Sequence, residues 1–385
     1  MHKTDAAPPI LIAWPVNGST GWGLYGLHLA VQLKRVGRRV YLAHAPDLSG
    51  VAAPLHALLP QATDPLPDPA ERIVVVSALG NRPDAPPGIN LPNPCYHVGL
   101  TVFEDTGCDD ADLANLRQYD RLIAPSRWCA NVLAGHGFPD APVCYQGYDD
   151  SVFHPAPRVR ALVGEPGWDG RILVFSGGKL EYRKGQDIAV AAFRLFRETH
   201  PNAVLVTAWH NPWPATMEGI WNAGHVKGVP KVVHGVADIA GWLAMNGVPR
   251  EAHLDLGQLS QVEAAQAIRE CDIAVFPNRA EGATNMVLAE CLGVGVPCVT
   301  VDQTGQAEGG ISAMGLYAPA VPDAHVPRRL YRGTEGWAEV APDILAGGMV
   351  DVVDGRRSNG LPPRPWSLCA PHFSALLTVP AEVTA

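Results

Sequence analysis

Two glutamates, Glu281 and Glu290, bracket the segment of this chain whose residue types are best suited to chemistry. Small and polar residues follow Glu281, and an apolar run begins near Met286, which predicts a loop that opens a helix. The N-terminus of a helix presents free backbone N–H groups and the positive end of the helix dipole. Amides that favour an anion, beside carboxylates that can hold hydroxyl groups, indicate a site for a phosphorylated sugar.

The two carboxylates also have simpler interpretations. Glu290 lies among apolar residues of the predicted helix, so it must reach solvent or find a partner, and ribose hydroxyls would provide one. Glu281 closes a short run that contains Arg279, so an ion pair between these two side chains is the alternative to ligand binding. We expect both glutamates to contact a ligand.

A second segment carries two lysines, Lys179 and Lys184, on a glycine-bearing loop between a predicted strand and a predicted helix. A diphosphate leaving group needs positive charge as its bond to a sugar breaks, and two lysines can supply that charge without a metal. The alternative is that both lysines are simply solvated in an exposed loop. Their place in the same half of the chain as Glu281 and Glu290 favours the functional interpretation.

A third segment, near the N-terminus, has the spacing Gly21-x-Gly23-x-x-Gly26 after a predicted strand. This spacing matches the dinucleotide fingerprint, but the fingerprint also needs an acidic residue at the end of the second strand, where Asp47 fits only loosely. A nicotinamide or flavin site is therefore disfavoured. Glycines that only let a strand and a helix pack closely are one alternative, and a loop that faces another phosphate ligand is the favoured one.

The elements that must position these residues alternate between short apolar runs and helical patterns, which predicts a mainly parallel sheet in each half of the chain. The predicted strands are 10–16, 39–44, 73–77, 97–103, 121–124, 143–145, 171–176, 203–209, 253–256, 273–276 and 298–301. The predicted helices are 24–36, 112–117, 127–135, 188–198, 261–269 and 286–292. Ligands of such sheets bind outside the carboxyl ends of the strands. Glu104, just after a strand, is therefore favoured as a site residue over His97, which begins the same strand.

Size and composition narrow the function classes. The 385 residues are enough for two domains with separate cores. A net charge of −9 argues against a general nucleic-acid-binding surface. The eight cysteines form no Cys-x-x-Cys pair and several lie in apolar runs, which favours buried free thiols in a reducing cytosol.

No apolar run approaches the length of about 20 residues that a membrane-spanning helix needs, and no apolar signal core precedes the first predicted strand. We therefore expect a cytoplasmic protein without a transmembrane segment, for which peripheral membrane contact stays open. Neither a His-x-x-x-His pair nor an Asp-x-Asp loop stands out, so no metal site is expected.

Three segments together resemble one family. They are Gly21-Trp22-Gly23, the run from Gly178 to Gly185, which is similar to a Gly-Arg-Leu-x-x-x-Lys-Gly motif, and the glutamate pair. The chain resembles the retaining glycosyltransferases of the GT-B fold, family four, which use nucleotide-diphosphate sugars. The order of features matches over most of residues 10–301.

The resemblance implies an α/β fold of the GT-B type, with two Rossmann-like doubly wound domains that face a central cleft. Residues 1–158 would form the acceptor domain and 159–340 the nucleotide-sugar donor domain. Residues 156–170 are rich in proline, glycine and charge, and this composition predicts the interdomain linker. Residues 341–385 would form a tail that packs back on the N-terminal domain. The acceptor would be a glycan, a lipid or a small molecule, and neither a cofactor nor a metal would be required.

Roles for single residues also follow from the resemblance. Glu290 would hold the nucleotide ribose, Glu281 would lie beside the donor sugar, and Lys179 with Lys184 would neutralise the diphosphate. The expected catalytic residues are Glu281, Lys179, Lys184 and Glu104. The expected donor-binding residues are Gly21, Trp22, Gly23, Gly178, Lys179, Lys184, Glu281, Gly282, Ala283, Thr284, Asn285, Met286 and Glu290.

The chain departs from the family pattern in three places. Lys179 replaces an arginine, which keeps the charge but loses the bidentate fork. Eight residues rather than seven separate the glutamates, which on one continuous helix would rotate Glu290 by about 100°. We therefore expect Glu281 in the loop, where the extra residue is absorbed. The histidine that the family often carries in its N-terminal domain has no clear match, and Glu104 is the expected substitute.

The function expected from the resemblance is transfer of a sugar to an acceptor hydroxyl with retention of anomeric configuration. The alternatives are a GT-B sugar-nucleotide epimerase or phosphorylase-like enzyme, and a nucleotide-sugar-binding protein without catalytic activity. A dehydrogenase ranks last, because the acidic residue of the dinucleotide fingerprint has only a loose match.

Overall fold

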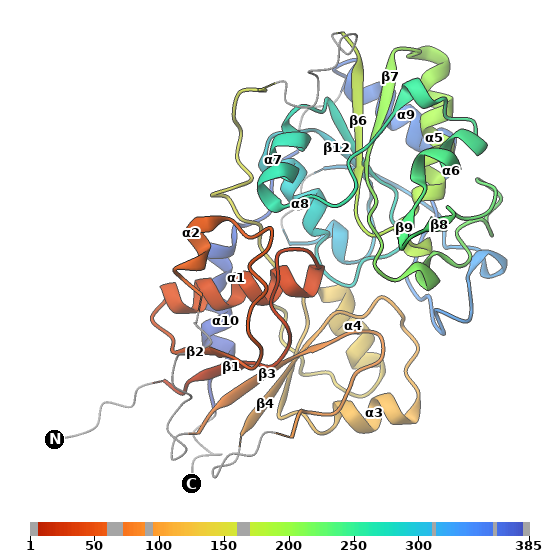
Figure 1. Cartoon of the computed structure of the whole chain (residues 1–385). Coiled ribbons are helices and arrows are strands. Elements are labelled where there is room, and N and C mark those ends of the chain that lie inside the picture. Colours follow the sequence, from red (N-terminus) through yellow and green to blue (C-terminus); the bar gives the residue numbers. More distant parts are fainter. Residues whose placement is uncertain are drawn as a thin grey trace. The chain divides into compact units, whose positions relative to one another are not determined.

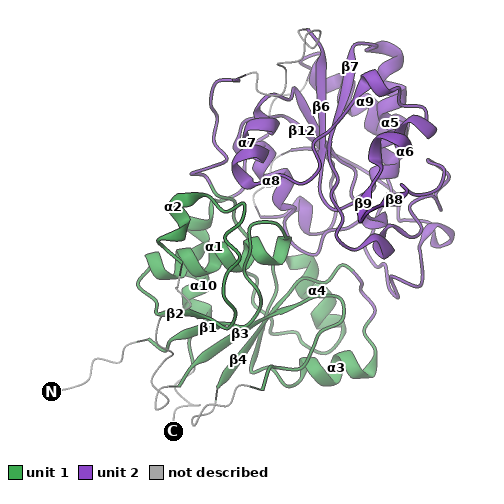
Figure 2. Cartoon of the chain, in the orientation of Figure 1, with its two compact units in different colours: residues 1–104, 108–149, 364–385 green, residues 105–107, 150–363 purple. Residues whose placement is uncertain are grey.

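The computed structural model describes residues 7–59, 72–88, 95–159, 170–309, 313–356 and 360–379. The chain forms two compact units, which are coloured separately in Figure 2. Unit 1 comprises residues 1–104, 108–149 and 364–385, and unit 2 comprises 105–107 and 150–363. Each unit is an α/β structure built on its own parallel sheet.

Unit 1 is built on a five-stranded parallel sheet in the order β2-β1-β3-β4-β5. The strands are β1 (Ile10–Ile12), β2 (Val40–Leu42), β3 (Val74–Leu79), β4 (Tyr96–Thr101) and β5 (Arg121–Ile123). The helices are α1 (Gly21–Arg35), α2 (Ala53–His56), α3 (Asp110–Leu116), α4 (Arg127–Gly135) and α10 (Trp366–Leu376). Figure 1 shows α1 and α10 on one face of the sheet and α3 and α4 on the other. Apolar side chains of β1, β3 and α1 form the main core.

Unit 2 is built on a six-stranded parallel sheet in the order β10-β7-β6-β11-β12-β13. The strands are β6 (Ile172–Gly177), β7 (Ala203–Ala208), β10 (His253–Asp255), β11 (Ile273–Phe276), β12 (Cys298–Val301) and β13 (Met314–Leu316). A separate antiparallel hairpin joins β8 (Val232–Val233) and β9 (Val236–Ala237). The strand order reverses between β6 and β11, so the loops after these two strands meet at one edge of the sheet, where ligands of doubly wound folds bind.

The helices of unit 2 lie on both faces of its sheet. They are α5 (Gln186–Thr199), α6 (Ile239–Met245), α7 (Gln261–Arg269), α8 (Met286–Gly293) and α9 (Pro342–Val353). Short 3-10 turns occur at η1 (Tyr182–Lys184), η2 (Pro214–Met217), η3 (Arg250–Ala252), η4 (Gly305–Ala307) and η5 (Asp323–His325). Figure 1 shows α5 and α9 on one face and α7 and α8 on the other. Because both faces are covered, the central strands β7 and β11 are almost entirely buried.

The predicted helices and strands agree best with the structure where a capping or helix-breaking residue marks the end of the element. The helices at 127–135 and 261–269 and the strands at 273–276 and 298–301 have the bounds expected from the sequence. In contrast, the expected strand at 143–145 is only an isolated bridge between Val143 and Ala124. The first strand is also shorter than predicted, because the chain leaves the sheet after Ile12.

The division of the chain differs from the expected boundaries at 158/159 and 340/341. The units change at 149/150 and again at 363/364. The second difference has a clear cause, because α9 packs against α5 in unit 2 whereas α10 packs against α1 in unit 1. Residues 160–169 of the expected linker lie outside the described residues.

Within the described part of the chain, no helix is long and apolar enough to cross a membrane. All eight cysteines are free thiols. Six of them are buried, and Cys95 and Cys108 are half-buried.

Candidate functional site

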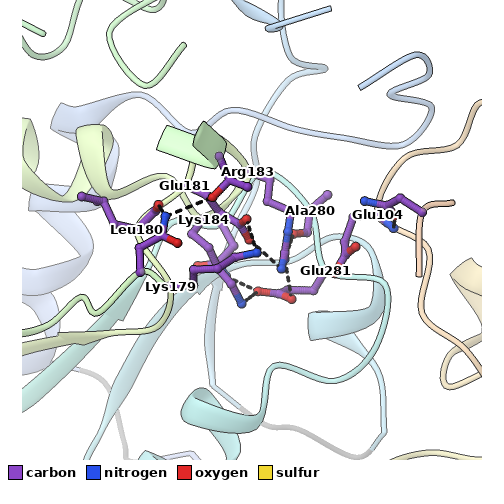
Figure 3. Close-up of polar contacts among 12 residues, drawn as sticks. Glu104, Lys179, Leu180, Glu181, Arg183, Lys184, Ala280 and Glu281 are labelled. Atoms are coloured by element: carbon purple, nitrogen blue, oxygen red, sulfur yellow. Dashed lines mark hydrogen bonds and ion pairs between the residues drawn. The ribbon is translucent and has the colours of Figure 1, made fainter. Parts of the chain in front are cut away.

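Glu281 lies in the loop between β11 and α8, and its side chain is almost completely buried. Arg183 Nη1 donates a hydrogen bond to Glu281 Oε2 over 2.8 Å. Lys184 Nζ and Asn278 Nδ2 both donate to Glu281 Oε1. Figure 3 shows Arg183 and Lys184 reaching this carboxylate from the loop after β6. A buried carboxylate is tolerated only when it is paired in this way.

The surroundings of Glu281 determine its charge. Burial raises the pKa of Glu281, but the positive charges of Lys184 and Arg183 outweigh burial and lower this pKa to about 2. Burial lowers the pKa of Lys184, although Glu281 opposes that shift. Glu281 is therefore a carboxylate at neutral pH, and it has no proton to give as a general acid.

The charges continue along the loop after β6. Lys179 Nζ lies 2.7 Å from Glu181 Oε2, and Arg183 Nη2 lies 2.7 Å from Glu181 Oε1. The result is an alternating chain, Lys179–Glu181–Arg183–Glu281–Lys184, in which three cations face two carboxylates. This charge chain carries a formal charge of +1. The alternative of two solvated lysines was wrong, because Lys184 is only 13% exposed and both lysines are paired.

Backbone contacts join the two loops that carry the charge chain. Gly185 adopts a φ of +70°, and a Cβ atom at this position would overlap the Pro277 carbonyl oxygen. Only glycine therefore allows the loop after β6 to approach the end of β11. Arg279 N–H donates to the Arg183 carbonyl oxygen over 2.7 Å, which fixes the two loops to each other.

Arg279 does not pair with Glu281, so the alternative ion pair considered from the sequence was wrong. The Arg279 guanidinium is fully buried and donates two hydrogen bonds to Asp187, over 2.8 and 2.7 Å, and one to Glu339 over 2.6 Å. It also stacks on the Tyr182 ring, 4.1 Å from the ring centroid. Two buried carboxylates and a ring thus anchor the start of the Glu281 loop.

Thr304 holds the backbone of Glu281 from the other side. Its φ of 56° and ψ of −159° place a β-branched residue in a region that is essentially restricted to glycine, at a cost of about 1–3 kcal/mol. Thr304 Oγ1 accepts the Glu281 N–H over 3.0 Å, and the Gly305 N–H donates to the Glu281 carbonyl oxygen over 2.9 Å. The peptide groups on both sides of the Glu281 Cα are therefore hydrogen-bonded.

The helix after this loop begins as predicted. Asn285 caps α8 by accepting the Leu288 N–H over 3.3 Å, and Glu281 lies in the loop before the cap. The prediction that Glu281 lies in the loop before the helix is confirmed. Glu290 lies on α8 and is half-buried. Residues 282–285 are buried, and their contact with a ligand stays a prediction.

The glycine segment of unit 1 has different surroundings, and Gly21, Trp22 and Gly23 form the first turn of α1 rather than the loop expected from the sequence. Asn17 Oδ1 accepts the N–H groups of Ser19 and Thr20, and Thr20 Oγ1 accepts the Gly23 N–H to cap α1. A Cβ atom at Gly23 would overlap the Asn17 side chain. Trp22 stacks on the Tyr25 ring. Packing thus accounts for Gly23, while donor contact by Gly21, Trp22 and Gly23 stays a prediction.

Glu104, the expected acceptor-side residue, belongs to unit 1 and follows β4 as predicted. It is half-buried, and its N–H donates to Asn81 Oδ1 over 2.7 Å. His97 lies near the opposite end of β4, where its N–H donates to Asp120 Oδ2 over 2.7 Å. The role of Glu104 stays a prediction.

Sequence reasoning missed several residues of the charge chain and its supports. Arg183 and Glu181 lie between the two predicted lysines, and the run Glu-Tyr-Arg-Lys was a signal that could have found them. Asn278 and Thr304 gave no such signal, because their importance depends on where the loops meet. Among the described residues, no group of His, Cys, Asp and Glu side chains has an arrangement that could hold a metal ion.

No protein-family model and no curated protein sequence matches this chain. Solved structures do match it over almost its whole length. Sucrose-phosphate synthase from Thermosynechococcus elongatus is similar with a TM-score of 0.56 and 15% identity, covering 96% of this chain and 98% of that one. The Anabaena protein HepE in complex with UDP-glucose is similar with a TM-score of 0.58 and 12% identity, covering 96% and 99%.

A third similar structure is an α,α-trehalose-phosphate synthase (UDP-forming) from Burkholderia xenovorans in complex with glucose-6-phosphate. Its TM-score is 0.57 at 12% identity, and the alignment covers 96% of this chain and 100% of that one. The chain has the GT-B fold. The two parallel sheets of the units are the Rossmann-like sheets of this fold, and the charge chain lies at the strand-order reversal of the second sheet.

Proposed function

We propose that this GT-B chain is a retaining glycosyltransferase of family four and that unit 2 binds its nucleotide-diphosphate-sugar donor. The observation that carries the proposal is the charge chain Lys179–Glu181–Arg183–Glu281–Lys184 at the reversal between β6 and β11. Its excess positive charge, beside the N-terminus of α8, suits a diphosphate. UDP and UDP-glucose occur in similar structures of HepE, which supports a uridine nucleotide as the first ligand to test.

The proposed reaction needs electrostatic stabilisation more than proton transfer from the protein. The bond between the anomeric carbon and the β-phosphate oxygen breaks, and negative charge grows on the departing diphosphate. Lys179, Arg183 and Lys184 stabilise that charge without a metal. The acceptor oxygen bonds to the anomeric carbon on the same face, and its proton passes to the departing phosphate.

Glu281 has a supporting role in this mechanism. It is ionised at neutral pH, so it holds Arg183 and Lys184 in place and can accept a hydrogen bond from a donor-sugar hydroxyl. Glu290, on the helix that Glu281 precedes, holds the ribose hydroxyls in this proposal. Glu104 of unit 1 serves the acceptor.

Binding of UDP and UDP-glucose to a Glu290→Ala variant, measured by calorimetry, tests the donor site. We expect the affinity to fall at least about tenfold, because two hydroxyls lose a charged acceptor. Glu251→Ala is the matched control, since Glu251 is an exposed glutamate of the same unit. Equal affinity of wild type and Glu290→Ala would exclude Glu290 from the donor site. Titration with GDP, ADP and dTDP sugars identifies the base.

Turnover separates the enzymatic alternatives. A glycosyltransferase consumes UDP-glucose in proportion to an added acceptor, and NMR shows the same anomeric configuration in donor and product. An epimerase changes the sugar nucleotide without an acceptor, and a protein that only binds it leaves the NMR spectrum unchanged.

A further inference from the structure

Trp213 is a large aromatic residue that the core of unit 2 does not use. It follows β7, lies between Pro212 and Pro214, and is 53% exposed. Lys179 Nζ, the first cation of the charge chain, lies 5.2 Å from the centroid of the Trp213 ring. An exposed indole ring is thus placed directly beside the group proposed to meet the diphosphate.

The backbone around Trp213 is fixed by a buried side chain. Asn211 is only 6% exposed, and its Oδ1 accepts the Trp213 N–H over 2.8 Å. Asn211 Nδ2 donates to the Leu180 carbonyl oxygen and to Thr216 Oγ1. These bonds tie the loop after β7 to the loop after β6. The backbone that carries the exposed ring is therefore held by buried polar contacts.

Lys179 links the ring to the rest of the site. Its Nζ atom contacts both the Trp213 ring and the Glu181 carboxylate, which in turn pairs with Arg183. A cation at one part of an indole ring leaves the rest of the ring available for stacking. A tryptophan side chain has few rotatable bonds and loses little conformational freedom when a ligand stacks on it, so it suits recognition of a flat ring.

We propose that Trp213 stacks on a ring of the bound nucleotide sugar, next to the diphosphate that Lys179 meets. This inference rests on the proposed function and adds a residue that the resemblance did not supply. Two rings of the ligand have a suitable flat face, namely the nucleobase and the pyranose. Stacking on tryptophan needs only such a face. The experiment below distinguishes stacking on the nucleobase from stacking on the pyranose.

The test measures affinity for UDP and for UDP-glucose in Trp213→Ala, Trp213→Phe and Trp221→Ala. Trp221 is the matched control, because it follows β7 as well and is 42% exposed. We expect Trp213→Ala to weaken binding about 10- to 100-fold, as base stacking on an aromatic ring does, and Trp213→Phe to restore most of it. Trp221→Ala is expected to bind like the wild type.

Fluorescence gives a second readout that a purely structural role would not change. UDP or UDP-glucose should alter the tryptophan emission of the wild type and of Trp221→Phe, and this change should be much smaller in Trp213→Phe. A loss of affinity for UDP itself assigns the stacked ring to the nucleobase. A loss confined to UDP-glucose assigns it to the pyranose.

Other outcomes overturn the inference in distinguishable ways. If the wild type binds UDP or UDP-glucose and Trp213→Ala binds both equally well, Trp213 is not part of the site, while the proposed function stands. If the wild type binds neither these ligands nor the other sugar nucleotides, the proposed function and this inference both fail. A thermal melt of each variant shows whether a loss of affinity reflects unfolding instead. If Trp213→Ala is unfolded, the affinity of Trp213→Phe decides whether an aromatic ring at this position is needed for binding.

Discussion

The β1–α1 junction of unit 1 and the β6–α5 junction of unit 2 begin with the same kind of sequence but have opposite character. Both carry glycines where a buried strand leads to a helix: Gly21 and Gly23 lie in the first turn of α1, whereas Gly178 and Gly185 precede α5. In unit 1, neutral side chains occupy the loop, and Asn17 and Thr20 accept its N–H groups. In unit 2, Gly185 precedes α5 without a side-chain cap, and charged residues occupy the loop. Glycines therefore allow close packing in both junctions, whereas charged side chains line only the second.

The energetics of the two junctions differ accordingly. A neutral N-cap contributes about 1 kcal/mol, and its loss exposes the helix end to water. Removing one member of a buried charge network leaves an uncompensated charge, which costs about 3–5 kcal/mol. Substitutions should therefore affect the unit 2 junction more strongly than the unit 1 junction.

The largest effect is expected for Arg279→Met, which leaves Asp187 and Glu339 without their shared cation. The free energy of unfolding should fall by about 3–5 kcal/mol. Urea unfolding of the variant and of Arg250→Met, an exposed arginine of the same unit, measures the difference. A loss below about 1 kcal/mol would show that the network does not stabilise the junction.

Glu281→Gln should have the next largest effect, because Lys184 loses its negative partner and Arg183 keeps only Glu181. We expect a loss of about 3 kcal/mol at pH 7. The folded pKa of Glu281, about 2, lies below the value in an unfolded chain, so its contribution is complete above about pH 4.5 and is lost as pH falls toward 2. The difference between wild type and Glu281→Gln in urea unfolding should therefore shrink as pH falls from about 4.5 toward 2, and a constant difference would contradict this.

In unit 1, Thr20→Ala removes the cap of α1 and should cost only about 1 kcal/mol. Thermal unfolding measures that loss, with Thr20→Ser as the control that keeps the hydroxyl. A parallel UDP titration tests whether Gly21, Trp22 and Gly23 contact the donor. Weaker binding supports contact, and unchanged binding assigns these residues to packing alone.

The smallest effect on stability is expected for Thr304→Gly. Glycine relieves the backbone strain but removes the hydroxyl that accepts the Glu281 N–H, so the two changes should cancel to within about 1 kcal/mol. Donor affinity should nevertheless fall about fivefold, because Glu281 is held less firmly. Thr304→Ser keeps the hydroxyl and should restore the affinity. Equal affinity in the glycine and serine variants would show that the hydroxyl does not position Glu281.

Much of the fold could be predicted because its signals are local. Ser260 and Glu263 form a capping box that marks the start of α7, and the apolar run of β11 ends at Pro277. The position of Glu281 in a loop could also be predicted from the residues that follow it. The isolated bridge at Val143 was mistaken for a strand, because an apolar run shows propensity but not which neighbour it will pair with.

The sequence by itself determined the two α/β halves, the glycine-bearing loops and the residue types of the candidate donor site, since periodicity and caps act over a few residues. Only the tertiary structure decided which charged side chains pair with one another. Arg183 and Lys184 lie 98 and 97 residues from Glu281, and Arg279 selects Asp187, 92 residues away, over the glutamate two positions along. Such pairings depend on the strand order that brings β6 beside β11, and no local pattern encodes that neighbourhood.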